Sequence, residues 1–411
     1  MPEQNKKMVP QIRFKGFSEE WIEDQLGERV EFFSGLTYSP SNVQNGVGTL
    51  VLRSSNVKNG EVVEADNVYV DSKIVNSKNV EVGDIAVVVR NGSRSLIGKH
   101  AQIKVKMDNT VIGAFMTGIH SQRPAFTNAL LDTVQFDNEI AKNLGATINQ
   151  ITTGSFKKMM FHFPEPAEQI QIGVYFKELD QMIGLHQRKH EKLVTLKKAM
   201  LKKMFPQNGA TTPEIRFKGF SKPWEEKKLG ECAKFSKGQG YSKGDLVASG
   251  APIVLYGRLY TNYQTEISEV DTFVIENIGS VKSTGKEVIV PSSGETPEDI
   301  ARASAIVKAG LLLGGDLNII LPASNIDSCF LALTISNGTP RKDLEKRAQG
   351  KTVVHIRNSD LETVTVRYPS MEEQKKIGTY FRQLDELIEQ HGTQLTKLKQ
   401  IKTACLEKMF V

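Results

Sequence analysis

The chain has 411 residues, of which 39% are hydrophobic, and its formal net charge is +6. This length corresponds to about two to three domains, with enough apolar residues for ordinary cores. The longest apolar stretches fall far short of the ~20 residues that a membrane span needs, and the three cysteines show neither disulfide nor zinc-site spacing, so we expect a soluble, cytoplasmic protein with ordinary thiols at Cys232, Cys329 and Cys405.

The first element along the chain, Pro10 to Glu28, recurs 203 residues later as Pro213 to Glu231, with 13 of 19 positions identical. A second segment, Pro164 to Phe205, recurs as Pro369 to Phe410 at an offset of 205. Such self-similarity indicates an internal repeat, so two copies of one unit fill the chain. The ends of the copies match while their middles have diverged, which we interpret as one scaffold used twice to present two different surfaces.

The first part of each copy contains short β-branched runs separated by Gly, Asn, Asp and Ser, which predicts strands joined by turns. The expected strands lie at residues 49–52, 68–70 and 85–89 in the first copy and at 253–255, 288–290 and 319–321 in the second.

Three matched loops keep their strand framework between the copies but change their polar tips. The substituted residues are Arg, Asn, Asp, Glu, Ser and Thr, which are the types that read base edges in the major groove. Polar loop tips that drift freely are the competing interpretation. The sequence therefore predicts a DNA-reading surface made by Arg53, Ser54, Asn56, Arg90, Asn91, Ser93, Arg94, Lys99 and Thr117 in the first copy and by Tyr256, Arg258, Ser292, Ser293, Glu295, Thr296, Asp316 and Asn318 in the second.

The second part of each copy predicts a long helix, about 60 Å at ~1.5 Å per residue. Apolar residues or His recur there at spacings of three and four, which is typical of a coiled-coil seam. Two equal apolar strips cannot stay exposed over about ten turns, so we expect the helices to pack on each other. The expected seam contains Ile172, Phe176, Leu179, Ile183, Leu193 and Leu196 in one helix and Ile377, Phe381, Leu384, Ile388, Leu398 and Ile401 in the other.

Two equivalent seam histidines, His186 and His391, have no companions at metal-ligand spacing, so we interpret them as polar residues that set the helix register. The cation-rich stretch from Arg188 to Lys203 fits either a solvated helix end or a surface that approaches nucleic acid or an acidic partner.

Catalytic signatures are weak. The segment from Gly279 to Lys286 resembles a phosphate loop, but five residues rather than four separate its glycines, and Glu287 stands where Ser or Thr is needed. The histidines pair with no plausible nucleophile. We therefore expect no catalytic residue and no metal on this chain. A coiled-coil scaffold whose globular parts bind protein remains the alternative to a DNA reader.

Three motifs occur in order and twice: W-x4-L-G-E at residues 21–28 and 224–231, P-x3-E-Q-x2-I-G at 164–173 and 369–378, and helices that end in Lys-Met-Phe at 203–205 and 408–410. Together they resemble the specificity subunits of type I restriction-modification enzymes. The loops at 90–100 and 291–300 are similar to those of the target-recognition domains in that family.

The resemblance implies an α+β fold with two tandem mixed α/β target-recognition domains, at 1–164 and 213–369. Each is followed by a long helix, at 165–205 and 370–411, with a linker at 206–212. The two helices would pack as an antiparallel coiled coil with an internal pseudo-two-fold repeat.

The implied function is non-catalytic: each domain would read one half of a split, asymmetric target in double-stranded DNA. Two methyltransferase subunits would dock on the helices, and restriction and motor subunits would join them. Adenine methylation and DNA cleavage would belong to those partners. S-adenosylmethionine, ATP and Mg would also bind the partners, with no cofactor on this chain.

Overall fold

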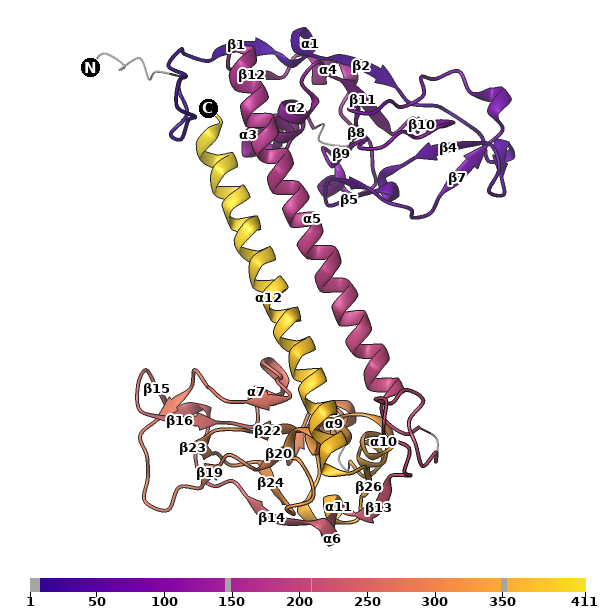
Figure 1. Ribbon diagram of the computed structural model, residues 1–411. Helices are drawn as coiled ribbons and strands as arrows, with labels where there is room; N and C mark the ends of the chain where they lie inside the picture. Colours follow the sequence, from indigo (N-terminus) through magenta and orange to yellow (C-terminus); the bar gives the residue numbers. More distant parts are fainter. Residues whose placement is uncertain (1–7, 145–148, 208, 349–352) are drawn as a thin grey trace, which may run out of the picture. The chain divides into compact units, whose positions relative to one another are not determined.

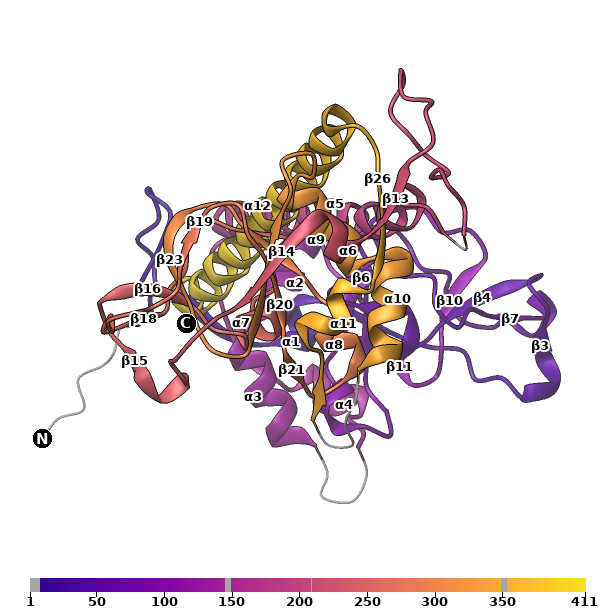
Figure 2. The same ribbon diagram turned by 90° about the horizontal axis from the view of Figure 1, so that it is seen from below.

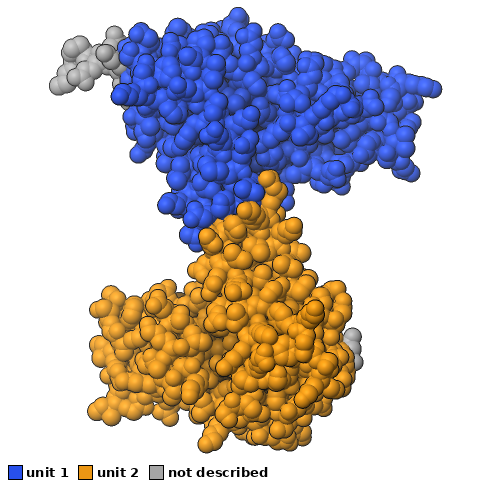
Figure 3. Space-filling view, viewed as in Figure 1, with its two compact units in different colours: residues 1–187, 393–411 blue, residues 188–392 orange. Residues whose placement is uncertain are grey.

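The computed structural model describes residues 8–144, 149–207, 209–348 and 353–411. It divides into two compact units: unit 1 comprises residues up to 187 together with 393–411, and unit 2 comprises 188–392 (Figure 3). Each unit combines a globular domain with parts of two long helices, α5 (Pro166–Lys203) and α12 (Met371–Met409) (Figure 1). Residue 208 of the expected linker lies outside the described residues.

The described residues of the globular domain of unit 1 form two four-stranded sheets, a two-stranded ribbon and a second two-stranded sheet of β5 (Val57–Lys58) and β6 (Glu61–Val62). One four-stranded sheet has the order β2-β11-β8-β9, and the other has the order β10-β4-β7-β3. The ribbon pairs β1 with β12. The bounds are β1 Ile22–Gln25, β2 Glu31–Ser34, β3 Val43–Gln44, β4 Thr49–Leu52, β7 Val68–Val70, β8 Ile85–Val88, β9 His100–Gln102, β10 Thr110–Ile112, β11 Met116–His120 and β12 Met160–Phe163.

Unit 2 contains the same strand orders, each with one additional edge strand. Its sheets run β14-β24-β20-β22-β17 and β15-β18-β16-β23-β19, and its ribbon pairs β13 with β26. Figures 1 and 2 both place β15 and β16 at one end of this domain and the ribbon at the other. The bounds are β13 Glu225–Lys228, β14 Ala233–Lys237, β15 Leu246–Val247, β16 Ala251–Val254, β17 Glu266–Ile267, β18 Phe273–Val274, β19 Lys282–Thr284, β20 Val288–Pro291, β22 Ser304–Ile306, β23 Ala309–Leu313, β24 Leu317–Pro322 and β26 Thr365–Tyr368.

The strands expected from β-branched runs are confirmed, with bounds shifted by up to two residues. Central strands such as β8 and β20 are buried at all four positions, and since successive side chains point to opposite faces, both faces of the sheet are covered there. Helices α2 (Pro124–Leu131) and α3 (Val134–Asn143) pack into the core of unit 1. Helix α9 (Ser328–Ser336) packs into the core of unit 2, and α10 (Gly338–Arg347) contacts α9.

Both long helices predicted by the three-and-four spacing are present. Within the described ranges, no helix is both long and apolar enough to cross a lipid bilayer. Helix α5 approaches α2 closely at Gly173, where a Cβ atom would lie 2.7 Å from the backbone nitrogen of Phe126. The glycine of the repeated I-G motif is therefore required for this helix packing.

The core of unit 1 is completed by an aromatic residue at the end of the second copy. Phe410, which follows α12, packs its ring against Trp21, Phe126 and Phe176, with ring centroids 5.9, 5.7 and 5.9 Å apart. The exposed fraction of Phe410 is only 4%. The helix encoded by the second copy thus ends inside the domain encoded by the first.

The reciprocal contact completes the core of unit 2. Phe205, which follows α5, packs against Trp224, Phe330 and Phe381, with ring centroids 6.2, 5.8 and 6.1 Å apart. The Trp and Phe residues of the repeated motifs therefore meet across the two copies rather than within one.

A buried ion pair fixes the start of each long helix. Arg13 donates two hydrogen bonds to Glu168, at 2.7 and 2.8 Å, and Arg216 donates two to Glu373, at 2.6 and 2.8 Å. Both carboxylates are almost completely buried, so this bidentate geometry is needed to offset their loss of hydration. These residues belong to the repeated motifs, which identifies the motifs as anchors of the framework.

We predict that the two buried phenylalanines stabilise different units. Phe410→Ala should destabilise unit 1 and Phe205→Ala should destabilise unit 2, each by roughly 3–5 kcal/mol, because each removes a ring from a filled aromatic cluster. Hydrogen exchange resolved by peptide would locate the loss of protection. Phe115→Ala, which removes a ring that is 54% exposed, is the matched control and should leave protection of the core unchanged. Equal loss in both units from either core variant would contradict the assignment.

Candidate functional site

The structure brings the three predicted loops of the first domain together. The side-chain amide of Asn91, after β8, donates to Ser54 Oγ, after β4, at 3.0 Å. Lys99 Nζ donates to the Ser54 backbone oxygen at 3.3 Å. The guanidinium of Arg90 lies over the ring of Phe115, just before β11, 4.9 Å from its centroid. These contacts join loops that are far apart in sequence into one polar surface.

The side chains on this surface differ in how far they reach into solvent. Arg90, Ser93 and Arg94 are exposed, while Ser54 and Asn91 are partly buried. Arg53 and Lys99 are also partly buried, and Arg53 Nη2 donates to the backbone oxygen of Asp66 at 2.7 Å. The exposed arginines are the residues best placed to approach a ligand, and the partly buried ones hold the loop tips.

Two predicted DNA-binding residues of the first domain are buried. The amide of Asn56 donates to backbone oxygens of Val63 and Ala65, and its exposed fraction is 0%. Thr117 lies inside β11, is 1% exposed and has Phe33 O as its acceptor. For both, the structure corrects the expectation of direct base contact, because the side chains satisfy their hydrogen bonds inside the domain.

In the second domain, Tyr256, Glu295, Thr296 and Asp316 are exposed. Their loops also meet: the ring of Tyr256 contacts that of Tyr260, and the Tyr260 hydroxyl donates to the backbone oxygen of Ser293, which is partly buried.

Three predicted residues of this domain are largely used internally. Asn318 is fully buried and donates to the backbone oxygen of Ile356 at 2.9 Å. Ser292 is 7% exposed and lies 3.4 Å from the Asp316 carboxylate. The guanidinium of Arg258 pairs with Asp271 at 2.8 Å, and only 12% of its side chain is exposed. Asn318 and Ser292 are buried, which corrects the prediction of base contact for these two, whereas the base contact predicted for the partly buried Arg258 stays a prediction.

The long helices also depart from the expected seam. Leu196 and Ile401, predicted inside the seam, are 38% and 37% exposed. The next residues, Lys197 and Lys402, turn inward instead and pair with Asp385 and Asp180 of the opposite helix. A coiled-coil seam assumes about 3.5 residues per turn, whereas a straight α-helix has 3.6. The seam therefore drifts around the helix, and Leu196 and Ile401 fall outside it. The remaining predicted seam residues are buried or partly buried.

A charge network ties the first domain to both long helices within unit 1. His100 follows the loop that carries Arg90 to Lys99, and its Nδ1 lies 3.0 Å from the Gly98 backbone oxygen. Its Nε2 lies 3.4 Å from Asp132, which is an ion-pair distance. Lys402 of α12 donates to Asp132 at 2.8 Å and to Asp180 of α5 at 2.6 Å.

The network changes the protonation of its members. Burial lowers the pKa of His100, but the neighbouring Asp132 carboxylate outweighs burial and raises this pKa above its ordinary value of 6.5. Burial raises the pKa of Asp132, but the neighbouring His100 and the hydrogen-bonded Lys402 lower it to about 2. His100 thus lies between a backbone oxygen on its Nδ1 side and the Asp132 carboxylate at ion-pair distance on its Nε2 side, and both oxygens favour the charged imidazole.

The phosphate-loop-like segment binds its own carboxylate. Glu287 accepts hydrogen bonds from the backbone nitrogens of Thr284, Gly285 and Lys286, at 2.7, 3.0 and 3.1 Å. The amide groups that would hold a phosphate are therefore occupied by a side chain of the same turn. Among the residues that the structure describes, no group of three or more His, Cys, Asp or Glu side chains is arranged to hold a metal ion.

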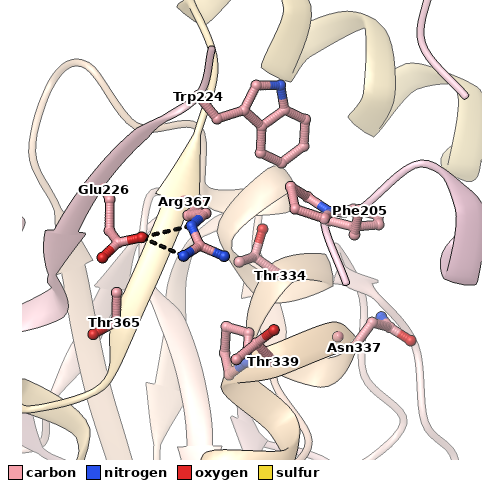
Figure 4. Close-up of a pocket in the computed structure, with 11 residues that line it drawn as sticks. Phe205, Trp224, Glu226, Thr334, Asn337, Thr339, Thr365 and Arg367 are labelled. Carbon is pink, nitrogen blue, oxygen red and sulfur yellow. Dashed lines mark hydrogen bonds and ion pairs between the residues drawn. The ribbon is translucent and has the colours of Figure 1, made fainter. Parts of the chain in front are cut away.

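A small cavity of about 210 Å³ lies in unit 2, beside the ribbon and α10 (Figure 4). Phe205 and Trp224 line it, and Arg367 crosses it to bind Glu226 at 2.6 Å. None of the predicted DNA-binding residues lines this cavity. It belongs to the anchoring of Phe205 rather than to the loop surface.

Comparison with known proteins matches the chain twice to one family. The model of the type I restriction modification DNA specificity domain matches residues 18–195 and again 221–400. The chain is 21% identical to the type I restriction enzyme StySPI specificity subunit of Salmonella potsdam, over 95% of this chain and 89% of that protein. It is 24% identical to the MjaVIII specificity subunit of Methanocaldococcus jannaschii, over 60% of each chain.

A solved structure has a similar fold. The type I restriction-modification S subunit from M. genitalium superposes with a TM-score of 0.63 at 14% identity, covering 98% of this chain and 99% of that one. The likeness shows that the two tandem domains and long helices form a fold already observed.

We predict that His100 makes stability depend on pH. Because its pKa is raised on folding, its contribution is fully present below about pH 6.5 and is lost as the pH rises through the raised value. Asp132 stays ionised throughout that range, since its pKa is about 2. The wild-type unfolding temperature should therefore fall between pH 6 and pH 9 more than that of His100→Gln. His162→Gln, outside the network, is the control and should behave like the wild type. Parallel pH profiles for wild type and His100→Gln would contradict the network.

Proposed function

The chain belongs to the family of type I restriction-modification DNA specificity subunits, and we propose that each of its two domains reads one half of a split, asymmetric site in double-stranded DNA. Specificity subunits of this family recognise DNA and are not catalytic. The observation that carries the proposal is the pair of loop clusters, one in each domain, in which matching strands hold different polar side chains.

The loop chemistry supports reading of base edges. Arg90 and Arg94 offer exposed guanidinium groups suited to guanine, whereas Glu295 offers a carboxylate suited to the amino group of cytosine. The two domains would therefore read unlike sequences. A scaffold that binds only proteins would not show the steep loss of affinity with salt that phosphate contacts cause.

We infer that α5 and α12 pack as one antiparallel coiled coil that sets the distance between the half-sites. The two target-recognition domains would span residues 1–164 and 213–369, as the internal repeat implies. Support comes from the contacts inside each unit. In unit 1, Tyr175 contacts Cys405 at 3.3 Å and Asp180 pairs with Lys402; in unit 2, Lys197 pairs with Asp385. In each pair, a later position on one helix meets an earlier position on the other.

We further propose that two methyltransferase subunits dock on equivalent apolar patches of these helices. In unit 1, Met182 and Ile401 are 45% and 37% exposed. Met182 lies two turns after Tyr175 and Ile401 one turn before Cys405, so both lie on the side of the helix pair marked by the Tyr175–Cys405 contact.

The second patch repeats the first. In unit 2, Leu387 and Leu196 are 42% and 38% exposed, and they occupy the positions of Met182 and Ile401 in the repeat with its offset of 205 residues. A single kind of partner bound twice is the simplest reason for matching exposed apolar pairs on a duplicated scaffold. Restriction and motor subunits would join this complex in the cytoplasm, and S-adenosylmethionine, ATP and Mg would bind to the partner subunits.

We predict that the reading of the two half-sites is separable. Replacing Arg90, Asn91 and Arg94 with Ala should relax one half of the target and leave the other half specified, because each good base contact is worth about 1–3 kcal/mol. Sequencing of methylated bases in cells that express the chain with its co-encoded methyltransferase would read both halves and their spacer. Glu295→Ala with Thr296→Ala is the reciprocal control and should relax the other half. Loss of both halves from either variant would contradict modular reading.

We predict a stepwise change in stoichiometry when the patches are altered. Met182→Glu with Ile401→Glu should leave one methyltransferase subunit on the chain, as should Leu196→Glu with Leu387→Glu, and all four changes together should leave none. The reason is that a charge in an apolar contact loses its hydration without gaining a partner. Native mass spectrometry measures the ratio. Val105→Glu, at a side chain that is 67% exposed, is the control and should leave two subunits bound. Two subunits on the fourfold variant would rule out the patches.

A further inference from the structure

The surface of the first domain contains a cavity that the sequence did not predict. Its volume is about 710 Å³, and its walls include Tyr38, Arg53, Ser54, Ser55, Phe115 and Met116. Residues from the first and third predicted loops therefore line one concavity. A volume of this order is typical of sites that enclose an organic ligand.

Two residues that line the cavity, Arg53 and Ser55, have polar side-chain atoms without a partner among the described residues. Arg53 Nε and Ser55 Oγ are buried, and neither has a hydrogen-bond partner among the described residues. Arg53 is nevertheless held in place, since its Nη2 donates to the Asp66 backbone oxygen at 2.7 Å. Buried polar groups are normally paired, so these two atoms indicate a place for polar atoms of a ligand.

The same cavity offers aromatic and apolar surface. Phe115 is 54% exposed although it is a large apolar side chain, and the Arg90 guanidinium lies over its ring at 4.9 Å. Tyr38 and Met116 line the cavity as well. An exposed ring beside a cation is the kind of surface on which a nucleobase stacks.

On the basis of the proposed function, we propose that this cavity is a subsite that takes one unstacked base from the half-site read by the first domain. Phe115 supplies the stacking surface, and Arg53 and Ser55 supply hydrogen bonds to the edge of the base. The base leaves its pair and neighbours to enter, so part of the specificity of this half-site comes from how easily that base pair opens. Phe115 thereby becomes a specificity-determining residue.

A mismatch scan tests the proposal directly. The chain would be assembled with its co-encoded methyltransferase and given duplexes of the mapped target in which one base of the opposite strand at a time is changed. At the position that enters the cavity, a mismatch removes the cost of breaking the pair, so binding should tighten by about tenfold or more. Phe115→Ala should remove this tightening. Ser55→Phe, which places a ring in the cavity, should remove it as well.

Internal controls separate the outcomes. Methyltransferases also swing their target base out of the duplex, so mismatches at the methylated adenines should tighten binding in both wild type and Phe115→Ala. Val105→Ala, which shortens another exposed side chain, should retain the tightening of the wild type. Tightening confined to the methylated adenines, or tightening elsewhere that survives both Phe115→Ala and Ser55→Phe, would overturn the subsite. Failure of the unmodified target to compete better than scrambled DNA would instead overturn the proposed function.

Discussion

The burial of Phe205 and Phe410 is the contact on which the rest of the fold depends. Each ring lies at the end of a helix encoded by one copy and fills an aromatic cluster in the domain of the other copy. The bidentate pairs Arg13–Glu168 and Arg216–Glu373 hold the beginning of each helix to its own domain. Both domains are thus attached to both helices, through filled cores and buried charge pairs whose disruption leaves a cavity or an unpaired charge.

This anchoring separates the framework from the loop tips. The side-chain amides of Asn56 and Asn318 donate hydrogen bonds to backbone oxygens inside the domains. Arg90, Arg94 and Glu295 extend into solvent from loops that those internal bonds support. Because the exposed side chains carry little of the packing energy, they can differ between the copies without a cost to the core. A scaffold of this kind can present two unlike chemical surfaces.

At the contact between the two helices, charged residues lie where a regular coiled-coil seam would have apolar side chains. Lys402 pairs with Asp180 and Asp132, and Lys197 pairs with Asp385. The pairs turn Leu196 and Ile401 outward. One result is a set of specific contacts that favours a single helix register, and another is a matching pair of exposed apolar patches. In unit 1 the same network extends through His100 to the loop that carries the exposed arginines.

The amino-acid sequence by itself determined the duplication, the long helices, the main strands and the three loops with divergent tips, because periodicity and repetition are local properties of a chain. It did not predict α9, whose residues after Ser328 are all buried, since a helix that is apolar on every side shows no periodicity. Nor could it separate Asn56 from Arg90, which are both polar residues in loops. Their burial and exposure were decided by the tertiary structure, as was the cavity beside Phe115, because these depend on contacts between segments that are distant in the sequence and are brought together only by packing of the core.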